Sequence, residues 1–197
     1  MSAARGVHDT RRRIETAALG LFAAKGVDGA SIREIAAGAG LTEGALYRHF
    51  ASKEELSRAL FIDRYGALAR GIETIRAERS GFGDRLDALV DFFAASFDAD
   101  PAGFAYVLVS QHEHLRGLDK AAPENAVAAL GRVFEDAMAA GDIPRGDVAL
   151  TTALALGLVV QPAIFFIYGR LAEPPSAHRA AIAGAIRRAV GVTDSAV

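Results

Sequence analysis

Two short helical patterns joined by one glycine turn most constrain the fold of this 197-residue chain. In SIREIAAGAGLTEGALYRHFASKEEL, which covers residues 31–56, apolar residues recur at helical spacing from Ile32 to Ala39. Gly40 then takes positive φ without steric strain, as a sharp turn between crossed helices requires. Thr42 is placed to cap the next helix. The segment therefore predicts two short helices that cross and pack closely.

The second of these helices has a core side and an open side. Leu46 and Phe50, four residues apart, lie on the core side. The opposite side presents small and polar residues: Gly44, Ala45, Tyr47 and Arg48. This is the layout of a helix-turn-helix, whose second helix enters the DNA major groove. The alternative is that these polar residues form an ordinary solvent-exposed face of a larger helical bundle. The polar side chains, the glycine turn and the helix caps, however, all occur at the positions that docking into DNA requires.

Helical signals continue along the whole chain. Ser31 with Glu34, and Ser52 with Glu55, match the capping box, and Gly26 is placed to end the first helix in a left-handed conformation. No alternating run joined by an Asn-Gly or Asp-Gly turn suggests a hairpin. The expected helices cover residues 10–25, 31–39, 42–50, 52–78, 84–98, 101–115, 123–140, 147–169 and 176–190. The fold class is therefore expected to be all-α.

Composition and charge narrow the class of protein. Hydrophobic residues make up 51% of the chain, too many for a disordered protein, and the absence of cysteine excludes disulfides, thiolate zinc sites and thiol nucleophiles. Residues 1–53 hold 8 Lys and Arg against 5 Asp and Glu, while the rest holds 14 against 19. A basic N-terminal part on an acidic body suggests a polyanion-binding end. Without cysteine or a secretory signal pattern, a cytoplasmic location is expected.

On these motifs the sequence resembles the tetracycline-repressor-like (TetR) family of transcriptional regulators. TRRRIETAALGLFAAKG resembles the family's first helix, and IREIAAGAGLTEGALYRHFASKEEL resembles its helix-turn-helix and the start of its fourth helix. The resemblance is specific in sequence over residues 10–60. Beyond residue 60 it extends only to the expected helical architecture. It implies a homodimeric, all-helical repressor whose C-terminal domain binds a small molecule and then releases DNA. The domains implied are 1–56 for DNA binding, with the helix-turn-helix at 31–50, and 57–197 for effector binding and dimerisation.

The resemblance also implies a set of DNA contacts. They are Thr10, Ser31, Arg33, Thr42, Glu43, Gly44, Ala45, Tyr47, Arg48, His49 and Lys53. Arg33 and Lys53 can neutralise phosphates, and Tyr47 and His49 can donate to phosphate oxygens. Arg48 is the expected base reader, since its planar fork matches guanine O6 and N7.

Two positions depart from the family pattern and leave the operator sequence open. Glu43 stands where a polar or basic residue is common, and it could accept from cytosine N4 or pair with a neighbouring cation. Ala45 stands where a hydroxyl residue is common, so only a contact with a thymine methyl group remains.

The C-terminal part is rich in aromatic residues, most of which we assign to packing and some to a cavity wall. The residues expected to bind a ligand are Phe93, Phe104, Val107, Gln111, His112, Phe134 and Phe165. His112 and His114 are two residues apart on a helix and point about 200° from each other, so they cannot share a metal ion. No metal or other cofactor is expected.

Residues 148–169 contain no Asp, Glu, Lys or Arg, a length that could cross a bilayer. Polar residues and Pro162 inside the stretch favour instead a helix with one face in the core and another against a second subunit. Pro162 should bend it. The dimer interface is expected at Leu154, Leu158, Phe165, His178, Ile182 and Ala185, as a four-helix seam.

These features predict a sequence-specific DNA-binding transcriptional regulator, a dimer on a palindromic operator, released by a small-molecule effector. Two alternatives stay open. A small helical enzyme would need an unseen site, because the sequence has no phosphate loop and no G-x-S-x-G motif. A non-specific nucleoid-type protein conflicts with the overall acidity. Activators share this architecture, so repression is itself an inference.

Overall fold

The computed structural model describes residues 2–115, 122–123 and 125–192, and of these it leaves the side chains of residues 2–8, 109, 112 and 113 undescribed. Nine α-helices and one 3-10 helix, with no strand, occur in these ranges. The expected all-α fold is confirmed. The chain divides into two compact units. Unit 1 comprises Met1–Arg64 and Ala102–Leu118, and unit 2 comprises Tyr65–Pro101 and Asp119–Val197.

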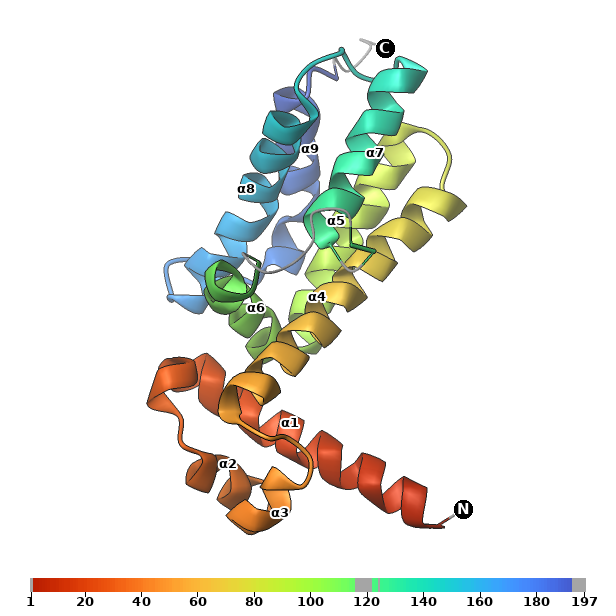
Figure 1. The fold of residues 1–197 in the computed structure, drawn as a ribbon. Helices are drawn as coiled ribbons and strands as arrows, with labels where there is room; N and C mark the ends of the chain where they lie inside the picture. Colours follow the sequence, from red (N-terminus) through yellow and green to blue (C-terminus); the bar gives the residue numbers. More distant parts are fainter. Residues whose placement is uncertain (1, 116–121, 124, 193–197) are drawn as a thin grey trace. The chain divides into compact units, whose positions relative to one another are not determined.

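Unit 1 is a helical head built around the helix-turn-helix (Figure 1). It contains α1 (Ser2–Gly29), α2 (Ile32–Gly38), α3 (Glu43–Tyr47), the first part of α4 (Lys53–Glu78) and nearly all of α6 (Pro101–His114). Its buried core contains side chains from each of these helices. The core residues that are nearly inaccessible to solvent include Ile14, Phe22, Ile35, Leu46, Phe50, Leu56 and Tyr106. Burial of each such side chain stabilises the head by roughly 1.5–3 kcal/mol.

A buried polar trio ties α6 to α4 within unit 1. The Tyr106 hydroxyl donates to the Ser57 carbonyl oxygen at 2.7 Å and lies 2.7 Å from the Ser57 hydroxyl. His114 Nε2 lies 3.1 Å from the same Ser57 hydroxyl. The ring of Tyr106 stacks on Phe22 of α1, with 5.7 Å between centroids. These contacts explain why most of α6 belongs to the head despite its distance along the sequence.

Unit 2 is a helical bundle. Besides the rest of α4 it contains α5 (Phe82–Ala99), α7 (Ala126–Ala140), α8 (Val148–Ile167), the 3-10 helix η2 (Pro175–His178) and α9 (Arg179–Ala189). Gly71 leaves room for the Phe92 ring of α5 against α4, because a Cβ there would lie 2.1 Å from that ring. The rings of Phe82 and Phe134 meet at 5.8 Å, and Phe97 meets Phe166 edge-on at 5.7 Å.

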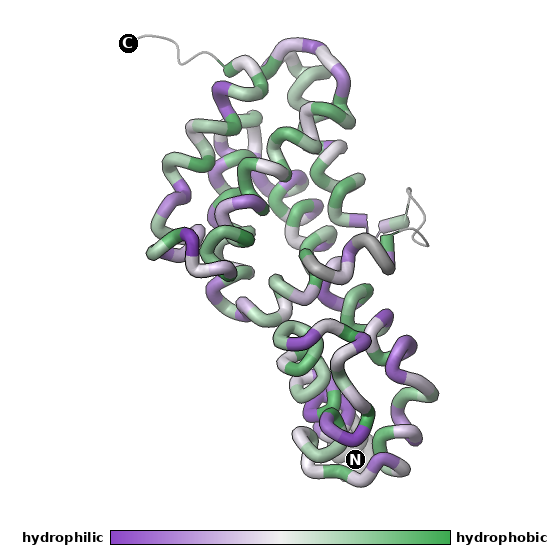
Figure 2. The backbone as a smooth tube through the Cα atoms, turned by 90° about the vertical axis from the view of Figure 1, so that its left-hand side faces the viewer, coloured by the Kyte–Doolittle hydropathy of each residue, from purple (hydrophilic) through white to green (hydrophobic). Residues whose placement is uncertain are grey.

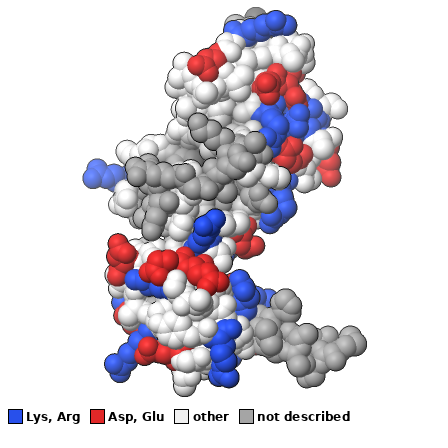
Figure 3. Space-filling model, viewed as in Figure 1, with Lys and Arg blue, Asp and Glu red and all other residues white. Residues whose placement is uncertain are grey.

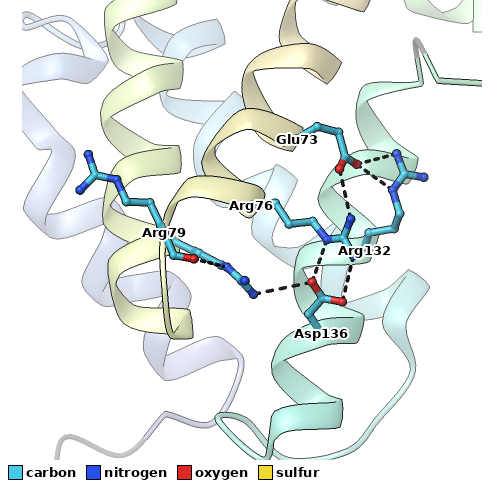
Figure 4. Close-up of polar contacts among 6 residues, drawn as sticks. Glu73, Arg76, Arg79, Arg132 and Asp136 are labelled. Carbon is cyan, nitrogen blue, oxygen red and sulfur yellow. Dashed lines mark hydrogen bonds and ion pairs between the residues drawn. The ribbon is translucent and has the colours of Figure 1, made fainter.

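A chain of ion pairs joins α4, α5 and α7 at the surface of unit 2 (Figure 4). Arg76 donates to Asp136 at 2.7 and 3.1 Å and to Glu73 at 3.2 Å. Arg132 donates to Glu73 at 2.7 Å from the other side. These bonds raise the pKa of Arg76 and hold the pKa of Asp136 below its ordinary value. The network fixes the second half of α4 against α7.

Helix α8 is apolar but largely uncovered. By length and composition it could cross a membrane, and only 17% of its most hydrophobic 18-residue window is buried. It lies on the side of unit 2 that faces the viewer in Figure 2. One exposed stripe runs along it, made of Leu150, Leu154, Gly157, Gln161 and Phe165. Leu154 is 49% exposed and Phe165 41%, so this face lacks a partner among the residues that the structure describes.

The expected helices are found, but their ends differ: α1 begins at Ser2 instead of residue 10 and extends past the kink at Gly26 to Gly29. The second helix of the motif is shorter than 42–50, since α3 ends at Tyr47, and the last helix opens as the 3-10 turn η2. Gly26 has positive φ (73°) as expected, but its ψ of 169° is extended, not that of a left-handed helical residue. The second capping box is only half formed, because Glu55 accepts from Ala51 N and not from Ser52 N. The domain boundary expected at 56/57 stays a prediction, since unit 1 runs on to Arg64.

Candidate DNA-binding interface

The turn between α2 and α3 is built as the glycine pattern requires. Gly40 has φ 66°, and the Leu41 amide donates back to the Ala36 carbonyl at 2.8 Å. A Cβ on Gly40 would lie 2.7 Å from Arg13 Nη2, the flexible end of a side chain that can move, so the positive φ is what favours glycine here. The same Arg13 atom donates to the Ala39 carbonyl at the end of α2. The turn thereby fixes the direction of α3.

Helix α3 buries one side and exposes the other, as expected. Leu46 is fully buried, whereas Tyr47 is 50% exposed. Glu43, Gly44 and Arg48 are also exposed, and Ala45 and His49 are half-buried. No atom lies within 4 Å of a Cβ placed on Gly44, so the open side has room for another molecule. The residues predicted to reach base edges therefore share one accessible face.

The two capping hydroxyls of the motif are used differently. Thr42 Oγ1 accepts from Ala45 N at 3.2 Å, which leaves its hydroxyl proton for a phosphate oxygen. Ser31 Oγ accepts from Glu34 N at 3.2 Å and also donates to the Glu34 carboxylate at 2.9 Å. The Ser31 hydroxyl is thus already committed in the free protein, and its predicted DNA contact would require the hydroxyl to turn away from Glu34.

Glu34 completes the capping box of α2 and is unusually acidic. A hydrogen bond from Lys25, followed by bonds from the Ser31 amide and hydroxyl, lowers the pKa of Glu34 from 4.5 to about 2. The carboxylate is therefore charged at neutral pH and satisfies the free amide at the start of α2.

The predicted phosphate-contacting residues lie at or near the surface of unit 1. Arg33 is exposed, and Thr10 and Lys53 are half-buried. Lys53 Nζ donates to the Ala30 carbonyl at 3.1 Å, which orients the ammonium group and leaves two further donors. Basic side chains appear on the end of unit 1 that carries α2 and α3, with acidic ones among and above them (Figure 3). The whole set of predicted DNA contacts stays a prediction.

Sequence reasoning missed how α1 supports the motif. Arg11 lies over the Phe50 ring, with its guanidinium carbon 4.5 Å from the ring centroid. Arg13 reaches the end of α2, as described above. A signal was present, because Arg11 stands three residues before Ile14, on the face that α1 buries.

The predicted ligand residues fall in both units. Phe93, Phe134 and Phe165 lie in unit 2, whereas Phe104, Val107 and Gln111 lie in unit 1; the His112 side chain is outside the described residues. A surface hollow of about 370 Å³ between α5 and the η2–α9 segment contains none of them. Ion pairs from Asp91 to Arg179 and from Asp87 to Arg187 cross from α5 to α9 near it. The ligand residues therefore remain a prediction.

The predicted dimer residues are unequally accessible in the single chain. Leu154 and Phe165 are exposed on α8, and Leu158, His178 and Ala185 are half-buried. Ile182 is buried in unit 2 itself, so it has little surface left for a partner. The most accessible of the predicted dimer residues, Leu154 and Phe165, both lie on the uncovered stripe of α8.

Two crossed helices, a glycine turn and an open, capped second helix define unit 1 as a helix-turn-helix domain. Residues 14–60 match the family model described as "Bacterial regulatory proteins, tetR family". This domain is therefore similar to the DNA-binding domain of tetR-family regulators, over a match that covers less than half of the chain.

Curated relatives and solved structures are similar to this chain over longer stretches. The HTH-type transcriptional repressor KstR2 of Mycobacterium tuberculosis is 36% identical over 113 residues, which are 56% of this chain and 54% of KstR2. A tetR-family regulatory protein from Rhodococcus RHA1 has a TM-score of 0.76 at 24% identity, over 94% of this chain and 98% of that one. FadR from Bacillus subtilis, solved in complex with stearoyl-CoA, has a TM-score of 0.73 at 17% identity, over 92% and 98%. The chain thus matches about half the length of KstR2, and the structural matches establish the fold.

Proposed function

We propose that this protein is a sequence-specific DNA-binding regulator of transcription, and that it acts as a repressor. The observation that carries the proposal is the open face of α3, where Tyr47 and Arg48 are exposed and Gly44 faces empty space. A short helix with this exposure, held by a turn and caps, fits the DNA major groove N-terminus first. The repressor KstR2 shares 36% identity across the matched region, which supports repression over activation.

Within this function the side chains divide by role. Arg48 reads a base, because its guanidinium matches guanine O6 and N7, a contact worth about 1–3 kcal/mol of discrimination. Tyr47, His49 and Lys53 hold the DNA backbone, and Thr42 adds its hydroxyl proton. Contacts to phosphate fix the orientation of the domain and give affinity for any sequence.

The protein works as a homodimer in this proposal, joined through the uncovered face of α8. Leu150, Leu154 and Phe165 form an uncharged exposed stripe, and such a contiguous apolar surface marks an interface. Gly157 in the stripe has no neighbour within 4 Å of a Cβ position, so a partner helix can approach closely. A two-fold dimer would place two copies of α3 in successive major grooves of a palindromic site, about 34–36 Å apart.

A small-molecule effector controls DNA release in this proposal, and the protein works in the cytoplasm, where its operator is. FadR, which shares this fold, holds stearoyl-CoA, so the fold can take up a ligand. Differential affinity of the effector for the DNA-bound and released states, of about 1–3 kcal/mol, suffices for a clear switch.

Selection of DNA by the purified full-length protein tests the proposal. Random duplexes are incubated with the protein, and the retained molecules are sequenced. We expect a palindrome with half-sites one helical turn apart. Retention without any enriched sequence would contradict specific regulation and support the non-specific alternative.

Two variants test the division of roles by competition between the selected sequence and random DNA at one salt concentration. Arg48→Ala should relax the preference at one base pair of each half-site, whereas Lys53→Ala should weaken binding to all sequences alike. If Arg48→Ala lowers both affinities equally, Arg48 contacts the backbone instead of a base.

A further inference from the structure

Arg11 stands at the point where the buried face of α1 leaves the core of unit 1. Arg11, Ile14, Ala18 and Phe22 are spaced by three, four and four residues, so they share one face of the helix. Ile14, Ala18 and Phe22 are buried, whereas the Arg11 side chain is 46% exposed. Helix geometry therefore directs Arg11 toward the helix-turn-helix, one turn beyond the last buried residue.

Arg11 contacts Phe50, the last residue of the helix-turn-helix at residues 31–50. Its guanidinium carbon lies 4.5 Å from the centroid of the buried Phe50 ring. Phe50 directly follows His49 and stands three residues before Lys53. The positive charge of Arg11 is thus held next to the segment that carries two residues of the backbone clamp.

The hydrogen-bonding groups of Arg11 are only partly used. Nε donates to the Glu15 carboxylate at 2.9 Å. Among the described residues, neither Nη group donates to a second partner. Contact with an aromatic ring restricts the movement of the guanidinium group, so less side-chain freedom is lost when its remaining donors bind an anion.

We infer that Arg11 is a further DNA-contacting residue, which binds a backbone phosphate through its Nη groups. The inference rests on the proposed DNA-binding function and adds a second residue of α1, next to Thr10, to the proposed DNA-binding surface. The competing interpretation is that Arg11 only covers Phe50 and pairs with Glu15, one helical turn away on an exposed surface.

Salt dependence of DNA binding separates these interpretations. The full-length protein and its variants are titrated with the selected duplex between about 50 and 200 mM salt. Each lost phosphate contact lowers the slope of log K against log salt by about 0.9. We expect Arg11→Ala to lower the slope by about that amount per subunit, and Arg11→Lys to restore most of it. Arg145→Ala, an exposed arginine of unit 2, should leave the slope unchanged.

Glu15→Gln gives an opposite prediction for the two interpretations. If Arg11 binds phosphate, removal of the Glu15 charge frees its guanidinium, and affinity for DNA should hold or rise. If Arg11 is only structural, Glu15→Gln and Arg11→Ala should both lower the melting temperature and leave the slope alone. That second result, or an unchanged slope in folded Arg11→Ala, would overturn the inference. Wild-type protein that binds no DNA at any salt would instead overturn the proposed function.

Discussion

A substitution at Gly44 is expected to change DNA affinity without destabilising the fold. Gly44 lies in the first turn of α3, has ordinary φ, and has no atom within 4 Å of a Cβ position. Gly44→Ala should therefore leave the free energy of unfolding unchanged or raise it by up to about 1 kcal/mol, since alanine is the better helix former. The added methyl group lies on the face proposed to meet the major groove. We expect operator affinity to fall about tenfold, equivalent to about 1.4 kcal/mol.

Thermal unfolding and a gel-shift titration of the same Gly44→Ala preparation check this prediction. The matched control is Gly83→Ala in α5, which is equally open but belongs to unit 2. It should change neither DNA affinity nor the selected sequence. Unaltered operator affinity in Gly44→Ala would mean that this face of α3 does not approach DNA closely.

Glu34 makes the start of α2 sensitive to acid. Its pKa in the folded protein is lowered from 4.5 to about 2, chiefly by Lys25 and then by Ser31. Because the folded value lies below the unfolded one, the stabilisation is present above about pH 4.5 and is lost as the pH falls toward 2. An NMR titration of the Glu34 carboxyl carbon should show a midpoint near 2, and Lys25→Met should move it upward. A wild-type midpoint near 4.5 would show that the capping box does not persist in solution.

The packing of the Phe92 ring against α4 depends on the absence of a side chain at Gly71. A Cβ on Gly71 would lie 2.1 Å from the Phe92 ring, so Gly71→Ala forces that ring out of its place between α4 and α5. We expect Gly71→Ala to lower the free energy of unfolding by about 1–3 kcal/mol, as other overpacked contacts do. Urea denaturation measures the difference, with Gly83→Ala as the control for helix propensity. Equal stability of Gly71→Ala and wild type would show that the ring moves aside freely.

Local signals made the elements predictable, whereas contacts between distant segments were not. Ser31, Gly40 and Thr42 act on residues within a few positions, so their caps and turn could be read from the sequence and are confirmed. The bond from Lys53 to Ala30, 23 residues apart, depends on packing of the whole head. So does the polar trio of Ser57, Tyr106 and His114, which assigns most of α6 to unit 1. The half-formed box at Ser52 shows that even a local motif can yield to a competing amide.

Binding of the whole molecule to a palindrome needs two copies of α3 on one duplex. Leu154 lies on the uncovered stripe of α8, and a charge there should prevent an apolar interface from forming. We expect Leu154→Glu to be monomeric by light scattering, to keep its helical content, and to lose most of its operator affinity. Ala95→Glu, on an exposed position of α5, is the control and should remain dimeric. A dimeric Leu154→Glu would move the interface elsewhere, and wild-type binding to vesicles would favour a membrane as the partner of α8.

Sequence-specific DNA binding through α3 is tested most directly by the ratio of two affinities, one for the selected palindrome and one for a scrambled duplex of the same length. Both affinities are measured by titration of the wild-type protein at one salt concentration near physiological. Specific regulators of this kind bind their site about 10³- to 10⁷-fold more tightly than other DNA. We expect a ratio in that range for the wild type, and a much smaller one for Arg48→Ala. A ratio near one in the wild type would contradict this expectation, because the open face of α3 would then read no sequence.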